Sequence, residues 1–169
     1  MTIYLDLDGV LADFEGTAIR ILKDEFGGLY DWKQEIEESN WGIFGSNIQN
    51  IYERLDVMSD ARALVEYVSR FGNVEILTAI PKRGYFPESV NHKRAWVDKN
   101  FPGLKTNFGP YAIDKQYHFK RGDVLIDDSS MNIEQWNDVG GLGILHINTD
   151  DTIEQLEFKR RAGLFQLRK

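Results

Sequence analysis

Near its start the chain reads Ile3-Tyr4-Leu5-Asp6-Leu7-Asp8-Gly9-Val10. An apolar, β-favouring run that ends in Asp-Gly predicts a buried strand followed by a turn. Similar runs predict three further strands at residues 74–78, 124–127 and 143–147. Gly or Asp residues flank several of these runs, which is typical of short strands in an α/β protein.

Helical patterns lie between the predicted strands. Asp60, Ser89 and Thr152 are predicted to begin helices, the last because Gln155 gives it capping-box spacing. A fourth helix is expected at about residues 131–139. Single-faced helices alternating with strands predict an α/β fold, a Rossmann-like parallel sheet in a three-layer arrangement with helices on both sides.

Residues 15–59 interrupt this alternation. Ile19, Leu22 and Phe26 recur at helical spacing, and the rest of the segment is rich in Trp and Phe. The segment is therefore expected to be a small helical cap inserted after the first strand. The predicted domains are a core of residues 1–14 and 60–169 and a cap of residues 15–59.

Composition narrows the classes of function. The 169 residues fit one domain, and 20 basic against 27 acidic side chains give a net charge of −7, which disfavours binding to extended nucleic acid. The absence of cysteine excludes thiolate catalysis and disulfides. Nothing resembles a membrane span or an export signal, so we expect a cytoplasmic protein with no membrane partner. A homodimer is left open.

Two of the predicted strands end in paired acids. Asp6 and Asp8 end the first strand, and Asp127 and Asp128 end the third. Because ligands of parallel sheets bind beyond the carboxyl ends of the strands, these four carboxylates predict a site for a hard cation, Mg²⁺ above all. The alternatives are an ordinary Asp-Gly turn for the first pair and a helix cap for Asp128.

A cation among acids calls for an anionic substrate, and phosphate is the natural one. The hydroxyl of Thr78 and the backbone N–H of Ala79 follow the second strand and could hold phosphoryl oxygens. Lys115 precedes the acidic strand and could neutralise the phosphoryl group; it is favoured over its neighbour Lys120. A strand-end threonine and a solvated lysine are the structural alternatives.

The order of these motifs resembles the haloacid dehalogenase (HAD) superfamily of phosphatases, and within it the 5′(3′)-deoxyribonucleotidase (5′-nucleotidase C) branch. The resemblance is carried by Asp-Leu-Asp-Gly-Val-Leu-Ala-Asp-Phe at residues 6–14, Lys-Arg-Ala-Trp-Val at residues 93–97 and Leu-Ile-Asp-Asp at residues 125–128. Thr78 and Lys115 stand where the two intervening motifs place them.

The resemblance implies a Mg²⁺-dependent phosphomonoesterase whose most plausible substrate is a nucleoside monophosphate. Asp6 would attack phosphorus to form an aspartyl phosphate, and Asp8 would serve as acid and then as base. The metal would be held by Asp6, by the backbone carbonyl of Asp8 and by Asp128, supported by Asp127. The implied phosphate-binding residues are Gly9, Thr78, Ala79, Lys93 and Lys115.

Phe14 would line the substrate pocket, and Trp41 of the cap could stack on a base or form the core of the cap. The chain departs from the branch where Arg is common after the acidic pair, since Ser129 stands there. A phosphatase for sugar phosphates therefore remains an alternative. Non-enzymatic alternatives are a phosphoacceptor signalling module, whose motif order is reversed, and an inactive HAD-fold binding protein, which would be expected to lack Asp6 or Asp8.

Overall fold

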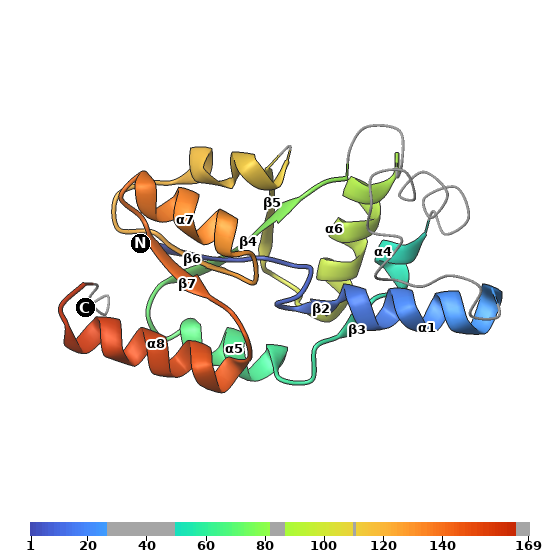
Figure 1. Cartoon of the computed structure of the whole chain (residues 1–169), viewed down its shortest axis with the longest axis horizontal. Helices are drawn as coiled ribbons and strands as arrows, with labels where there is room; N and C mark the ends of the chain where they lie inside the picture. Colours follow the sequence, from blue (N-terminus) through green and yellow to red (C-terminus); the bar gives the residue numbers. More distant parts are fainter. Residues whose placement is uncertain (27–49, 82–86, 110, 165–169) are drawn as a thin grey trace.

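The computed structural model describes residues 1–26, 50–81, 87–109 and 111–164 (Figure 1). A five-stranded parallel sheet runs through these residues in the order β5-β4-β1-β6-β7. Its strands in chain order are β1 Thr2–Leu5, β4 Asn73–Ala79, β5 Lys105–Gly109, β6 Val124–Asp127 and β7 Leu142–Leu145. The four predicted strands are confirmed: β6 has the predicted bounds, and the ends of the other three differ by one or two residues. The edge strand β5 was not predicted.

The central strand β1 is buried on both faces, which explains its unbroken apolar character. Ile3 pairs with Val74 of β4 on one side and with Val124 of β6 on the other. Ile3 and Leu5 point into one layer of core, whereas Tyr4 points into the other. Because β1 lies in the middle of the sheet, the residues that follow it reach the centre of the sheet's carboxyl edge.

Helices cover both faces of the sheet, as the α/β prediction requires (Figure 1). The face of Ile3 and Leu5 packs against apolar residues of α5 Ala61–Val68, α6 Ser89–Asn100 and α8 Thr149–Arg161. The face of Tyr4 packs against α7 Ser130–Asp138, whose Trp136 is fully buried. The three-layer arrangement expected from the sequence is confirmed.

The segment between β1 and α5 departs from the alternation, as expected. It contains the helices α1 Phe14–Phe26 and α4 Ile51–Arg54 and the short antiparallel pair β2 Ala12–Asp13 and β3 Asp56–Val57. The predicted helix is therefore present as α1. However, its buried face carries Thr17, Ala18 and Ile21, while Ile19 is 44% exposed, so the apolar face assigned to Ile19 was wrong. Trp41 lies outside the described residues.

The helix start predicted at Asp60 is confirmed, because α5 begins at Ala61 and Asp60 occupies its N-cap position. The Asp60 side chain makes no capping hydrogen bond, however; its carboxylate accepts a hydrogen bond from the backbone N–H of Thr149, 2.8 Å away. Two other predicted starts need correction. Ser89 is the first residue of α6 rather than its cap. The last helix begins at Thr149, with Asn148 as its cap, so Thr152 lies within it and is buried against His146. No helix in the described parts of the chain is long and apolar enough to cross a bilayer.

Candidate active site

The loop after β1 brings Asp6, Asp8 and Gly9 to the carboxyl edge of the sheet. The backbone N–H of Asp6 still pairs with the carbonyl of Ile126 at 2.9 Å, which fixes Asp6 beside β6, and the residue is only 7% exposed. Gly9 has a φ of +80°, and a Cβ at this position would collide with the carboxylate of Asp128. Glycine is therefore needed here both for the turn and for the close approach of the two acidic segments.

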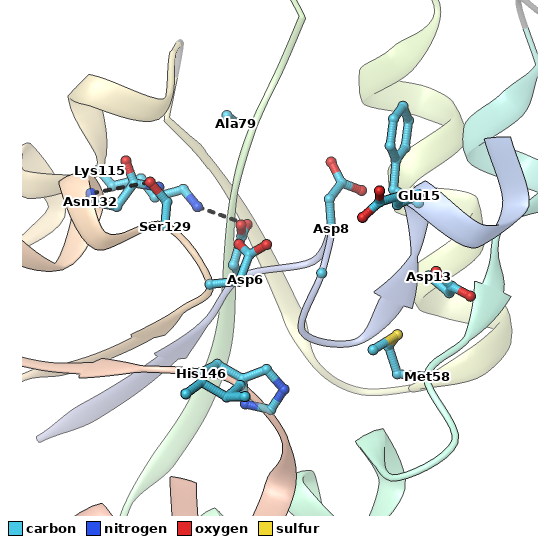
Figure 2. A pocket seen from close by; sticks show the side chains of 14 residues that line it. Asp6, Asp8, Asp13, Glu15, Met58, Ala79, Lys115, Ser129, Asn132 and His146 are labelled. Carbon is cyan, nitrogen blue, oxygen red and sulfur yellow. Dashed lines mark hydrogen bonds and ion pairs between the residues drawn. The ribbon is translucent and has the colours of Figure 1, made fainter. Parts of the chain in front are cut away.

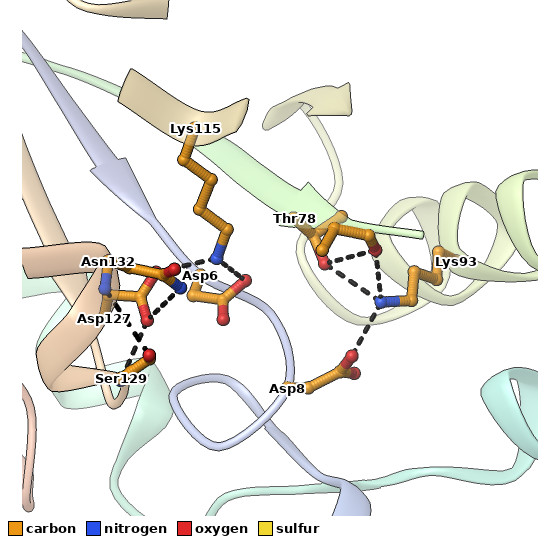
Figure 3. A network of polar contacts seen from close by, with 9 residues as sticks. Asp6, Asp8, Thr78, Lys93, Lys115, Asp127, Ser129 and Asn132 are labelled. Atoms are coloured by element: carbon orange, nitrogen blue, oxygen red, sulfur yellow. Dashed lines mark hydrogen bonds and ion pairs between the residues drawn. The ribbon is translucent and has the colours of Figure 1, made fainter. Parts of the chain in front are cut away.

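Lys115 lies at the centre of the acidic cluster. It belongs to η1, a 3₁₀ helix at Ala112–His118, and its Nζ lies 2.8 Å from Asp6 Oδ1 and 2.7 Å from Asp127 Oδ2 (Figure 3). Burial alone would lower the pKa of Lys115, but the two carboxylates raise it, so the lysine is charged. Lys120, the other lysine considered from the sequence, is exposed.

Asp127 is fully buried, and its carboxylate is surrounded by donors. Besides Lys115 it accepts hydrogen bonds from the backbone N–H of Ser129 at 2.9 Å and from the side-chain amide of Asn132 at 3.0 and 3.1 Å. Ser129 also caps α7, so the helix start and the acid are held by the same residue. Burial and the charge of Asp6 raise the pKa of Asp127, while Lys115 opposes that rise. Asn132 was not predicted from the sequence.

Three carboxylates in this cluster fit a divalent cation. Oxygens of Asp6, Asp127 and Asp128 all lie within 4.8 Å of one another. Burial, together with the charges of Asp6 and Asp127, raises the pKa of Asp128 to about 7, which reports a strongly negative site. Hard oxygen donors with mutual repulsion suit Mg²⁺. Because Asp127 is already held by three protein groups, Asp128 is the better placed of the two to contact an ion. The Asp8 carboxylate does not belong to this group.

The Asp8 carboxylate turns instead to Lys93, on α6. Lys93 Nζ lies 2.6 Å from Asp8 Oδ2, 3.0 Å from Thr78 Oγ1 and 2.9 Å from the carbonyl oxygen of Ala79 (Figure 3). Burial raises the pKa of Asp8, and Lys93 opposes that rise. The Thr78 hydroxyl is buried and lies 3.3 Å from the carbonyl of Ala79, so it is engaged within the protein.

A pocket of about 470 Å³ opens above these acids, a volume within the range of small-molecule sites (Figure 2). Seven residues expected from the sequence line or adjoin it: Asp6, Asp8, Gly9, Phe14, Ala79, Lys115 and Asp128. Thr78, Lys93 and Asp127 lie behind this lining and contact its members. The sequence prediction missed seven lining residues: Asp13, Glu15, Met58, Ser129, Asn132, His146 and Ile147.

Some of the missed residues had a detectable signal. Ser129 and Asn132 have the spacing of a helix cap with its bonded N–H, directly after the acidic pair. His146 was expected to be a packed histidine, and it is buried, with Nδ1 2.8 Å from the Thr152 hydroxyl and with a pKa lowered by burial. Its place in the pocket wall depends on the neighbouring strands β6 and β7, which the local sequence does not reveal.

The order of the sheet and the acids at the ends of β1 and β6 place the fold among the HAD hydrolases. The putative HAD-hydrolase YfnB from Bacillus subtilis, solved with magnesium, has a TM-score of 0.57 and 12% identity over 85% of each chain. A HAD-superfamily hydrolase from Geobacter sulfurreducens has a TM-score of 0.53 and 10% identity over 92% of this chain and 95% of that one. A hydrolase from Streptococcus pneumoniae has a TM-score of 0.51 and 16% identity over 92% and 97%.

A comparison of the sequence with protein-family models identifies the family of this chain. Residues 1–162 match the model of the family described as "5′ nucleotidase, deoxy (Pyrimidine), cytosolic type C protein", and the chain belongs to this family. It is therefore an enzyme, a HAD phosphatase, and the resemblance drawn from the motifs is confirmed. No match was found among proteins with curated descriptions.

Proposed function

We propose that this enzyme is a Mg²⁺-dependent, cytoplasmic phosphomonoesterase that hydrolyses nucleoside monophosphates through an aspartyl-phosphate intermediate. One observation carries the proposal: the Asp6 carboxylate, fixed at the end of β1 and paired with Lys115, lies in a small-molecule pocket beside Asp127 and Asp128. The family description supports a nucleotide as substrate.

In the proposed first half-reaction, Asp6 attacks phosphorus. A carboxylate oxygen of Asp6 forms the new bond to phosphorus as the ester bond breaks, and Asp8 gives its proton to the departing alcohol oxygen. In the second half, Asp8 takes a proton from water as that water attacks the phosphorus of the aspartyl phosphate. Inorganic phosphate leaves, and both carboxyl groups return to their starting states.

The other residues would bind and orient the phosphoryl group. Lys115 contacts two carboxylates, which leaves one of the three donors of its ammonium for a phosphoryl oxygen. Gly9 and Ala79 line the same pocket. Asp6, Asp128 and the backbone carbonyl of Asp8 would hold Mg²⁺, supported by Asp127; when bound, the ion neutralises negative charge on the phosphoryl oxygens.

The outer part of the pocket favours a substrate with a single phosphate. Asp13 and Glu15 line it, so further phosphate groups would meet negative charge. Phe14 offers an apolar surface beside them, which suits a sugar or a base. We propose that residues 15–59 form a cap over a core of residues 1–14 and 60–169, and that Trp41 of the cap contributes to the substrate pocket.

A substrate panel tests this function. Phosphate release should be fastest with one or more of dTMP, dUMP and other nucleoside monophosphates, and slower with glucose 6-phosphate and other sugar phosphates. Asp6→Asn should remove essentially all turnover while leaving the fold intact, since the amide is nearly isosteric and Lys115 keeps its ion pair with Asp127. Faster turnover of sugar phosphates would show that they, and not nucleoside monophosphates, are the preferred substrates. Robust activity of Asp6→Asn would refute the proposal that Asp6 is the nucleophile.

Chelation tests the metal. EDTA should abolish phosphate release, and Mg²⁺ in excess should restore it, because Lys115 alone does not offset the repulsion between three clustered carboxylates and the phosphate dianion. Equal rates in EDTA and in Mg²⁺ would contradict the proposed metal site.

A further inference from the structure

Lys93 is buried next to the pocket but does not line it. Its side chain is 1% exposed, and its ammonium group makes three hydrogen bonds, to Asp8, Thr78 and the carbonyl of Ala79. An ammonium group has three donors, so none is left for a substrate in this arrangement. This separates Lys93 from Lys115, which lines the pocket and keeps one donor.

Asp8 depends on this lysine for its orientation. Its Oδ2 is held by Lys93 at 2.6 Å, while its Oδ1 has no hydrogen-bond partner among the described residues. The carboxylate therefore has one oxygen anchored by the protein and one buried oxygen without a protein partner, in a residue that lines the pocket. A group that must give a proton to a bound ester needs one side fixed and the other not engaged by the protein.

Lys93 is itself fixed by three segments that are distant in sequence. Thr78 and Ala79 belong to the end of β4, Asp8 to the loop after β1, and the ring of Tyr52 on α4 lies 4.6 Å from the ammonium nitrogen. The position of Asp8 is thereby tied to the sheet on one side and to α4 on the other. A lysine so constrained is suited to hold another group in place.

We propose that Lys93 is a positioning residue that holds Asp8 for proton transfer to the leaving group, rather than a ligand of the phosphate. This inference rests on the proposed function. During the first half-reaction the proton moves from Asp8 Oδ1 to the ester oxygen as the bond from phosphorus to that oxygen breaks. Lys93 keeps its own protons throughout and continues to bind Oδ2.

The dependence on leaving group tests the proposal. Lys93→Met keeps the length of the side chain and removes the charge. For nucleoside monophosphates, whose alcohol must be protonated as it leaves, kcat should fall about 100-fold, the low end of what a general acid contributes. For 2,4-dinitrophenyl phosphate, whose leaving group needs no proton, kcat should change less than about fivefold, and KM should stay within about threefold for both substrates.

Two control variants make the result specific. Lys99→Met, an exposed lysine on the same helix, should behave as the wild type. Adding Lys93→Met to Asp8→Asn should lower kcat by less than about threefold further, because the two changes remove the same interaction. A rise in KM for both substrates, an equal fall in kcat for both, or an independent effect in the double variant would overturn the positioning role.

A binding experiment separates this inference from the proposed function. With lysine labelled at ¹³Cε, the Lys93 resonance, assigned from Lys93→Met spectra, should move in Asp8→Asn and stay in place when inorganic phosphate is added. Direct movement with phosphate and no response to Asp8→Asn would refute the inference even in an inactive protein. If the wild type hydrolyses no phosphate ester, the proposed function fails, and this measurement still decides whether Lys93 binds Asp8 or phosphate.

Discussion

Replacing Lys115 by methionine should destabilise the protein strongly and make its stability depend on divalent cations. Lys115 is 2% exposed and lies between Asp6 and Asp127, which are themselves buried. The variant removes the positive charge and leaves two buried carboxylates facing each other. Among the described residues, no other cationic side chain forms an ion pair with Asp6 or Asp127.

The size of the effect follows from the geometry. With an effective dielectric constant of about 20, each contact at 2.8 or 2.7 Å supplies about 6 kcal/mol of gross attraction, most of which is offset by the desolvation of the charges. Breaking a buried pair by removing one partner has a net cost of about 3–5 kcal/mol. For a chain of this size, that lowers the melting temperature by about 10 °C.

Urea unfolding in EDTA at pH 7 measures the loss directly. Excess Mg²⁺ should recover part of it, because the ion can take the place of the missing ammonium between the carboxylates. Lys120→Met is the matched control, since Lys120 is exposed and close in sequence, and its free energy of unfolding should stay within about 0.5 kcal/mol of the wild type. If Lys115→Met were as stable as this control in EDTA, the account of the buried ion pairs would be refuted.

Two further predictions concern the loops that frame the site. Burial alone would raise the pKa of Asp60, but hydrogen bonds from Thr149 lower that pKa below its ordinary value. The stability that Asp60 contributes is therefore present above the unfolded pKa of about 3.9 and is lost as pH falls through the lower folded pKa. Asp60→Ala should cost about 1 kcal/mol at pH 7 in urea unfolding and less at pH 3, and an equal cost at both pH values would contradict this. Gly9→Ala should abolish phosphate release because the added methyl group collides with Asp128. The control Gly103→Ala has a φ of +92° and no atom within 4 Å of the added methyl group, so it should keep turnover at a similar backbone cost of about 1 kcal/mol. Equal activity of the two variants would contradict the steric argument.

The central strands were predictable because a strand that is buried on both faces has a continuous apolar sequence. Strands β1 and β6 are continuous apolar runs, and each ends at the acids that form the site. The edge strand β5 reads Lys-Thr-Asn-Phe-Gly and is mostly half-buried, so its sequence carries no such run. Its place in the sheet comes from pairing with β4, for example Thr106 with Ile76, which is not visible in the sequence of either strand.

The helix starts show the limit of reading caps locally. Asp60 and Thr152 both have the residue type of a cap, but tertiary contacts use their side chains differently. Asp60 binds the backbone at the start of α8, and Thr152 binds His146. A polar side chain near a helix start can serve its own helix or a neighbouring one, and only the packing decides between them. For the same reason Asn132 was not predicted: it lies in the first turn of α7, and its side-chain amide donates a hydrogen bond to Asp127.

The structure separates the two acids of the first motif by giving each its own lysine. Asp6 is paired with Lys115, which also holds Asp127, whereas Asp8 is paired with Lys93, which also holds the end of β4. Two carboxylates two residues apart would otherwise share one environment and compete for one proton. Burial raises the pKa of Asp8 against the opposing charge of Lys93, so burial favours the proton that the proposed acid role needs, while Lys93 orients the carboxyl group. In the proposed division of labour Lys115 therefore faces the substrate beside Asp6, whereas Lys93 acts on Asp8 from behind the pocket.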